Sequence, residues 1–259
     1  NDGGLHMTYS YREIKAVFDS FFPGIIPSIG YFGLRDSGYY GFRDENETFI
    51  YKAGRIADDS LPAHGHGDIF SFEWSFNGSK IFIDKGTYEY NAGLRRDISR
   101  ATKSHNTISF EGIDQAQFYS SFRVGLRPKV EVEERNEGIK GLHIVGRHNG
   151  FKLQGLKTYH KRQLEYKANF GLTITDYVDD LNFSPRFNLL IPSSVKVNLT
   201  DVKSCTIRTK NSILCLNTEG DIRLTKSTYF PDFGVEEPCS KISIKLKSNK
   251  MKTSIHMVS

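Results

Sequence analysis

Four side chains that could bind a metal or move a proton lie within one stretch of the sequence: His64, His66, Asp84 and His105. Two imidazoles and a carboxylate, completed by a water molecule, would make a tetrahedral zinc site and leave the fourth group for chemistry. A single histidine is more often a core or surface group hydrogen-bonded to the backbone. The set as a whole supports a metal site, with a structural role as the alternative.

The spacing of these residues gives a mechanical reason for them to meet. On an extended strand His64 and His66 point the same way, although the glycines beside them also allow the two side chains to diverge. Asn77-Gly78 predicts a tight hairpin turn. The returning strand, Lys80–Asp84, would bring its last residue back near His66. His105 precedes a further expected strand and could complete the set.

A second cluster lies between Asp84 and His105. Guanidinium groups bind carboxylates and sulfates through two hydrogen bonds, and a tyrosine phenol can transfer a proton. A solvated basic loop with packing tyrosines is the alternative. The cluster comprises Tyr88, Tyr90, Arg95, Arg96 and Arg100. Three other histidines are interpreted as structural residues without nearby partners: His143, His148 and His160.

The element pattern predicts an all-β protein with one helix. Residues Tyr11–Phe22 repeat apolar side chains at helical spacing, and Pro23-Gly24 ends the helix. Its apolar stripe must be buried, either as the last helix of a missing domain or as a brace on a sheet. From Tyr31 onward the period becomes two, most clearly around Phe72 and Trp74. Many short strands separated by turn residues predict stacked antiparallel sheets. Further expected strands are Thr107–Phe110, Lys129–Glu133, Leu142–Gly146, Thr158–Tyr166, Leu172–Val178, Ser194–Leu199, Ser212–Asn217 and Ile242–Lys247.

Composition agrees with this fold class and bounds the function. The 259 residues include 23 glycines and 13% aromatic side chains, which is typical of a turn-rich β protein. The formal charge of +5 is compatible with an anionic partner and equally with an ordinary surface. No stretch has the length of a transmembrane helix, so membrane insertion is not expected. Three cysteines without a CxxC pair exclude a metal knuckle and allow either one disulfide or three thiols.

The beginning of the sequence looks like that of a fragment. It opens on Asn1 without a methionine, and residues 1–7 include Leu5-His6-Met7, a candidate expression-vector remnant. We expect residues 1–30 to be a helical linker segment and residues 31–259 to be a β-sandwich domain. A signal peptide or upstream domain would lie outside this sequence.

The central motifs resemble those of the heparinase II/III-like polysaccharide lyases. The order and spacing match over the stretch Ala63-His64-Gly65-His66-Gly67-Asp68, then Ser71-Phe72, Gly78, Asp84-Lys85-Gly86-Thr87-Tyr88-Glu89-Tyr90, Arg96, Arg100-Ala101-Thr102, Ser104-His105-Asn106-Thr107, Gly112 and Gln115. The resemblance weakens toward Asp180 and fades beyond it. It implies a C-terminal antiparallel β-sandwich that in the family follows an N-terminal (α/α) toroid.

The resemblance also implies roles for individual residues. His66, Asp84 and His105 match the family's metal ligands, usually for Zn²⁺, in a site that holds strands together and does not attack substrate. His64 matches the histidine that points into the substrate cleft. The candidate substrate-binding residues are Arg96 and Arg100 on the cleft wall and, from the same motif, Tyr88 and Tyr90.

The implied activity is β-elimination on a uronic-acid polysaccharide similar to heparan sulfate, alginate or a bacterial exopolysaccharide. The catalytic tyrosine and the Asn/His that neutralises the substrate carboxylate come largely from the toroid, so the isolated chain is expected to be inactive. We expect a bacterial periplasmic or secreted location and no nucleic-acid partner. Two alternatives remain: a non-catalytic carbohydrate-binding or structural module, and a cupin-like metal enzyme, for which the spacing after His66 is a poor match.

Overall fold

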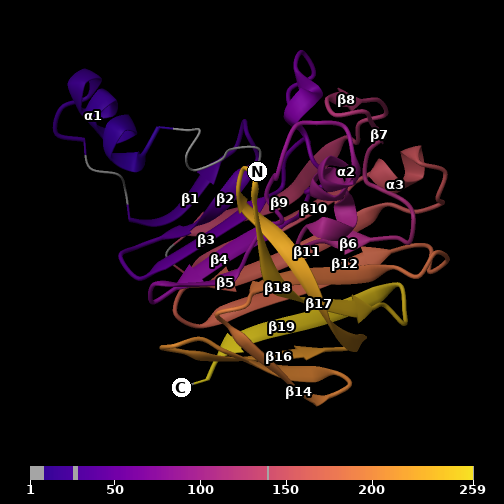
Figure 1. Ribbon diagram of the computed structural model, residues 1–259. Coiled ribbons are helices and arrows are strands. Elements are labelled where there is room, and N and C mark those ends of the chain that lie inside the picture. The colour runs from indigo at the N-terminus through magenta and orange to yellow at the C-terminus, as the bar shows by residue number, and fades with distance from the viewer. Residues whose placement is uncertain (1–8, 26–28, 139, 259) are drawn as a thin grey trace.

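The computed structural model describes residues 9–25, 29–138 and 140–258, which fold into antiparallel β-sheets with few helices (Figure 1). The expected all-β architecture is confirmed. The candidate vector remnant at residues 1–7 lies outside the described residues. No helix of the described part is long and apolar enough to cross a membrane.

The first sheet has five strands in sequence order, and residues 64–67 lie between its third and fourth strands. Asn77 and Gly78, both with positive φ, make the tight turn between its last two strands, so the predicted hairpin is confirmed. Its strands are β1 (Gly30–Leu34), β2 (Tyr39–Arg43), β3 (Glu47–Lys52), β4 (Phe72–Phe76) and β5 (Ser79–Phe82).

The second sheet has eight strands in the order β14-β15-β16-β19-β12-β11-β10-β9. Six of them lie at or near predicted strands, whereas β15 and β19 were not predicted. Their bounds are β9 (Val130–Gly138), β10 (Gly141–His148), β11 (His160–Lys167), β12 (Gly171–Val178), β14 (Lys196–Asp201), β15 (Ser204–Arg208), β16 (Ile213–Thr218) and β19 (Lys250–Met257).

A third sheet of four strands, in the order β17-β18-β13-β6, continues the layer of the first. The amide of Ile83, directly after β5, donates to the carbonyl of Leu190 on β13 at 3.0 Å. A small two-stranded sheet, β7 and β8, contacts the segment that ends at His64. The bounds are β6 (Ile108–Ser109), β13 (Arg186–Pro192), β17 (Asp221–Asp232), β18 (Val235–Lys245), β7 (Phe118–Tyr119) and β8 (Arg123–Val124).

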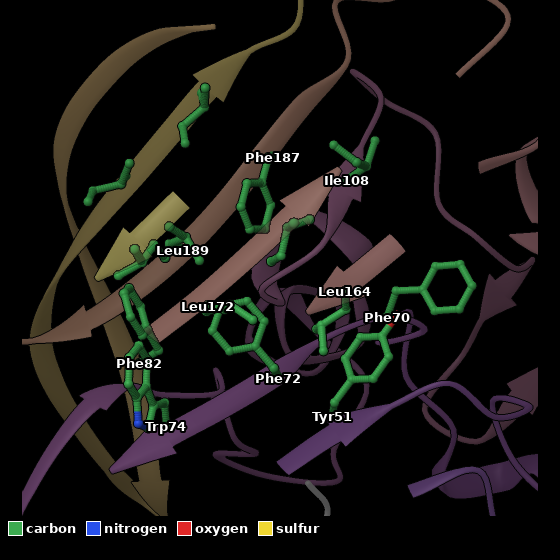
Figure 2. Packing of buried hydrophobic residues seen from close by; sticks show 14 of the residues in the cluster. Tyr51, Phe70, Phe72, Trp74, Phe82, Ile108, Leu164, Leu172, Phe187 and Leu189 are labelled. Atoms are coloured by element: carbon green, nitrogen blue, oxygen red, sulfur yellow. The ribbon is translucent and has the colours of Figure 1, made fainter. Parts of the chain in front are cut away.

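The hydrophobic core fills the space between the two layers. Figure 2 shows Phe72 and Trp74 of the first sheet in one cluster with Leu164 and Leu172 of the eight-stranded sheet. The ring of Phe49 on β3 stacks on Tyr166 of β11, with centroids 4.0 Å apart and planes 7° apart. Burial of such large aromatic side chains from both layers is the main stabilising contribution to a sandwich.

The helices are short and lie outside the sheets. Helix α1 (Tyr11–Phe21) begins at a capping box formed by Ser10 and Glu13, as the predicted helix requires. Its apolar side chains are exposed, Phe21 by 73%, so the helix does not act as a brace on a sheet (Figure 1). Two further helices were not predicted: α2 (Leu94–Arg100) and α3 (Gly150–Leu153).

The three cysteines are all free thiols. Of the two alternatives that the sequence allowed, a disulfide or three thiols, the structure has the second. Cys205 on β15 pairs in register with Leu216, and Cys215 on β16 pairs with Thr206. This offset of one residue sends the two side chains to opposite faces of the sheet. Cys205 is therefore buried in the core, and Cys215 is half-buried on the other face.

Candidate functional site

The His64–His66 segment adopts a short 3-10 turn and not a strand. Element η1 (Pro62–His64) ends at His64, which is exposed, whereas His66 is buried two residues later. Gly67 has no room for a side chain, because a Cβ there would collide with Thr102. The two histidines therefore diverge, as the irregular spacing had allowed.

Asp84 and His105 form the closest contact among the predicted metal ligands. Asp84 follows β5, and His105 follows the turn η2 (Thr102–Ser104). The Oδ2 atom of Asp84 lies 2.7 Å from the Nδ1 atom of His105. Burial alone would raise the pKa of Asp84 and lower that of His105, but their mutual charge and hydrogen bond reverse both directions. The two groups therefore form a charged, buried pair.

Asp84 is fixed from its other side by the turn that follows it. Its Oδ1 atom accepts a hydrogen bond from the amide of Gly86 at 3.0 Å. Gly86 has a φ of +71°, and a side chain there would collide with the carbonyl of Phe230 on β17. Because glycine adopts this conformation without strain, the Gly86-Thr87 step of the motif positions the carboxylate.

His66 lies next to this pair and to an arginine. Its ring centroid is 5.5 Å from that of His105, and its Nε2 atom is 3.4 Å from Nη1 of Arg96. The Nε2 atom of His105 is buried and makes no hydrogen bond. Nitrogen and carboxylate donors of this kind suit zinc. Within residues 9–25, 29–138 and 140–258, however, no three His, Cys, Asp or Glu side chains already form a metal cluster.

Helix α2 places its arginines in two different environments, whereas the sequence had suggested either an anion-binding fork or a solvated basic loop. Arg96 and Arg100 are one turn apart and both are buried, at 0% and 1% exposure. Arg95 points outward and pairs with Glu236 at 3.0 Å. The three arginines therefore do not form a single fork for an anion.

Arg100 holds the backbone around the site. Its guanidinium donates to the carbonyls of Gly65, Ser120, Ser121 and Arg123 at 3.0 to 3.2 Å. Arg96 also donates to Ser121, at 2.9 Å from Nε. The two arginines thereby fasten the β7–β8 segment over the histidines. Direct contact of either arginine with a substrate stays a prediction.

An aromatic rim surrounds the exposed His64. Its ring meets those of Tyr90 and Phe122 edge-on, with centroids 5.4 and 5.6 Å away. The guanidinium of Arg96 lies over the same two rings, at 5.2 and 5.6 Å. The guanidinium therefore brings a positive charge close to the exposed imidazole, which favours an approaching anion. His64, Tyr90 and Arg96 therefore lie together, and their predicted contact with substrate stays a prediction.

Tyr88 belongs to a neighbouring contact and not to this rim. Its ring lies 4.2 Å from the guanidinium of Arg95 and 5.5 Å from the ring of Phe230. Its predicted role in substrate binding is not tested by these contacts. Phe122 was missed by the sequence analysis, because a phenylalanine in a loop carries no chemical signal of its own.

Asn106 joins the segments that carry the site. Its side-chain amide donates to the carbonyls of Phe72 and Ile83 at 2.7 and 3.0 Å, and its Oδ1 accepts from the amide of Leu190 at 2.8 Å. The residue is fully buried. Because it bridges β4 and the residue before Asp84 to β13, Asn106 fixes the position of the neighbouring His105.

Residues 27–258 match the family described as heparinase II/III-like, C-terminal. The chain belongs to this family. The motif residues identified from the sequence, from Ala63 to Gln115, all lie within the matched region. No curated protein matches the chain.

Solved structures show the same fold at low sequence identity. The heparan sulfate lyase HepC from Pedobacter heparinus aligns with a TM-score of 0.80 and 14% identity, covering 100% of this chain and 43% of that protein. A heparinase III gene product with methylated lysines gives 0.80 and 17%, covering 99% and 42%. Another heparinase III gives 0.68 and 18%, covering 91% and 38%. This heparinase II/III-like chain thus spans less than half the length of these proteins.

Proposed function

We propose that this chain is the C-terminal β-sandwich of a polysaccharide lyase that cleaves a uronic-acid polysaccharide by β-elimination. The observation that carries the proposal is the exposed His64, framed by Tyr90 and Phe122 with the cation of Arg96 beside them. A substrate similar to heparan sulfate is the first choice, followed by alginate or a bacterial exopolysaccharide.

The reaction defines what the site must supply. A base removes the proton from C5 of the uronate, a cation or hydrogen-bond donor neutralises the adjacent carboxylate, and an acid protonates the departing O4. An imidazole is suited to the first or second task near neutral pH. We assign one of these two tasks to His64. The positive charge of Arg96 would attract an approaching substrate carboxylate.

The proposal includes a toroid domain that completes the site. The solved lyase structures are more than twice the length covered by this chain. Helix α1 presents Ile14, Val17 and Phe21 to solvent at 56%, 60% and 73% exposure, a face suited to packing against such a domain. The isolated chain would then lack activity. A polysaccharide substrate also leads us to propose a periplasmic or secreted location.

The test compares the chain with its full-length parent. The parent, given heparan sulfate, alginate and other uronates, should produce the ultraviolet absorbance of an unsaturated uronate, and His64→Ala should abolish it. His143→Ala is the matched control, because His143 lies half-buried on the eight-stranded sheet between Glu134 and Glu165. Full activity of His64→Ala would refute the assigned role.

We further propose that His66, Asp84 and His105 hold Zn²⁺ or another divalent metal. The donor types fit zinc, and two of the donors, Oδ2 of Asp84 and Nδ1 of His105, already lie 2.7 Å apart. A bound ion would act as a structural cross-link between the segments. Elemental analysis should find about one metal per chain, in line with a single structural site. A chelator should lower the melting temperature, and His105→Ala should abolish both effects. A metal-free chain with unchanged stability would refute this proposal.

A non-catalytic carbohydrate-binding module is the second candidate. The rings of Tyr90 and Phe122 beside His64 favour it, since they could bind a saccharide without the groups needed to cleave it. Saccharide binding by the full-length parent without any unsaturated product would support this alternative. The family match and the layered sheets leave the cupin-like alternative without support.

A further inference from the structure

A basic hollow lies on the outer face of the four-stranded sheet, on the strands β17, β18, β13 and β6. It has a volume of about 380 Å³. Its lining contains four cationic side chains and a single carboxylate, that of Glu111. The cations are Lys103, Arg186, Arg223 and Lys241. Figure 1 shows the long β17–β18 hairpin that forms one side of this sheet.

The strand register brings these side chains to one face. Arg223 on β17 lies opposite Ser243 on β18, which in turn lies opposite Asn188 on β13. In the next row Thr225 lies opposite Lys241. Residues two apart on a strand share a face, and the alternate residues, such as Ile242 and Ile244, are fully buried in the core. The polar side of the sheet therefore gathers Arg186, Arg223 and Lys241 on one face, with Asp221 at the end of the row of Arg186.

The four cations lack acidic partners among the described residues, whereas several cations elsewhere in the molecule have them. Arg147 pairs with Glu131, Lys161 with Glu133 and Lys247 with Asp221. Among the described residues, no carboxylate lies within ion-pair distance of a cation of the basic hollow. Such a concentration of positive charge favours binding of an anion.

Lys241 is half-buried in the basic hollow, whereas Lys103 and Arg223 are exposed. Its Nζ donates to the carbonyl of Lys103 at 2.7 Å, which leaves two further N–H groups to donate. Burial, followed by the charges of Lys103 and Lys85, lowers the pKa of Lys241 to about 8. A bound anion would offset both the cost of burying the Lys241 ammonium and its repulsion by the other two lysines.

The floor of the basic hollow is held in place by hydrogen bonds. Asn188 Nδ2 donates to Ser109 Oγ at 2.8 Å, and Ser243 Oγ donates to Asn188 Oδ1 at 3.1 Å. Because Ser109 accepts this bond, its own hydroxyl hydrogen is available for a ligand. Fixed hydroxyl donors between cations are the groups that recognise sulfate and carboxylate oxygens.

We propose that the basic hollow binds the sulfate or carboxylate groups of an anionic saccharide, at a place distinct from the site around His64. The choice of a saccharide rests on the proposed function, whereas oxyanion binding itself follows from the charges and donors described above. The basic hollow would hold a segment of the polysaccharide while another segment occupies the cleft.

The test is calorimetric titration of the chain with a heparin tetrasaccharide and with an unsulfated oligouronate. Arg186→Gln/Arg223→Gln should weaken binding about tenfold or more, since two charge-assisted contacts are lost. Lys196→Gln/Arg208→Gln is the matched control, because it removes two exposed charges from β14 and β15. The control should bind as the unchanged chain does, and added salt should weaken binding in both.

The outcomes separate this proposal from the lyase proposal. Binding of both saccharides indicates that a carboxylate suffices, and binding of heparin alone indicates that sulfate is required; either result supports the site if the double variant is impaired. Equal binding by the two double variants, or no binding by the chain, overturns it. Arg223→Gln alone, at an exposed position, provides a second variant if the double variant unfolds. His64→Ala should leave tetrasaccharide binding at the basic hollow unchanged even if it abolishes cleavage by the parent.

Discussion

Arg162 and Asp176 lie opposite each other on β11 and β12 and form a fully buried two-point ion pair. The distances are 2.7 Å from Nε to Oδ1 and 2.9 Å from Nη2 to Oδ2. The Nη1 atom of Arg162 reaches across the core to the carbonyls of Phe70 and Asn106 at 2.6 and 3.2 Å. The eight-stranded sheet thereby fixes the segments that follow His66 and His105.

The first prediction concerns this ion pair. Asp176→Asn removes the charge that balances Arg162 and leaves a buried guanidinium uncompensated. We expect the free energy of unfolding to fall by about 3–5 kcal/mol, measured by urea denaturation. Glu131→Gln, in the exposed pair with Arg147, should cost at most about 1 kcal/mol. Equal effects of the two substitutions would contradict the assigned importance of the buried pair.

A second prediction concerns pH, through two neutral histidines beside the pair. The amide of Gly150 donates to His148 Nδ1, so the hydrogen of His148 is on Nε2, which points at His160 Nδ1 at 3.2 Å. His160 Nε2 then donates to Asp176 at 2.8 Å. A second proton on either ring would sit on Nδ1, where it would face another N–H donor. Burial lowers the pKa of both histidines, and for His160 it outweighs the opposing effect of Asp176.

The lowered pKa values of the two histidines determine how stability changes with pH. Below the ordinary histidine pKa of 6.5 the unfolded chain takes up protons that the folded chain does not, so stability falls as the pH is lowered. The slope should approach about 1.4 kcal/mol per pH unit for each histidine. Urea denaturation at several pH values between neutral and mildly acidic measures it. His148→Gln should reduce the slope, and an unchanged slope in this variant would contradict the assignment.

A third prediction tests Asn106 with an isosteric change. Asn106→Asp keeps the acceptor for Leu190 but loses the two hydrogen bonds donated to Phe72 and Ile83, and it places carboxylate oxygens against their carbonyls. We expect a loss of about 3 kcal/mol or more in the free energy of unfolding, measured by thermal or urea denaturation. Asn198→Asp on β14, where the side chain is exposed, is the control and should have little effect. A fully stable Asn106→Asp chain would contradict the bridging role.

A fourth prediction concerns the segment held by Arg100. Arg100→Lys keeps the charge, but a single ammonium cannot reach the four carbonyls that the guanidinium joins. Amide hydrogen exchange should become faster in β7, β8 and the turn between them, while the core strands remain protected. Arg95→Lys, on the exposed side of α2, should leave exchange in this segment unchanged. Unchanged protection in Arg100→Lys would mean that other contacts hold the segment.

Sequence reasoning succeeded where one physical signal dominated. The alternation around Phe72 and Trp74 and the Asn77-Gly78 turn identified the β4–β5 hairpin, because side-chain period and turn chemistry agree there. Helix α2 was missed because its buried face carries Arg96 and Arg100, so it has no apolar stripe to detect. Strand β13 was missed because its second half, residues 189–192, is an apolar run that ends in a proline and does not alternate.

The buried network of His148, His160 and Asp176 was misinterpreted for a different reason. His148 and His160 had been described as lacking nearby partners, which is wrong, since they face each other in the register of β10 and β11. A connection containing α3 separates them in sequence, so the pairing depends on where the strands end. The His64 segment shows the same limit: the residue types predicted a site, but only the 3-10 turn decides which histidine is exposed.

The offset between Cys205 and Cys215 has a practical consequence. Because the two sulfur atoms lie on opposite faces of β15 and β16, a cross-link between them would require the strands to slip by one position and turn core leucines outward. The sandwich should thus melt at the same temperature with or without a reductant. Cys215 also offers a half-buried attachment point for a spectroscopic probe, on a strand remote in sequence from every residue assigned to the cleft.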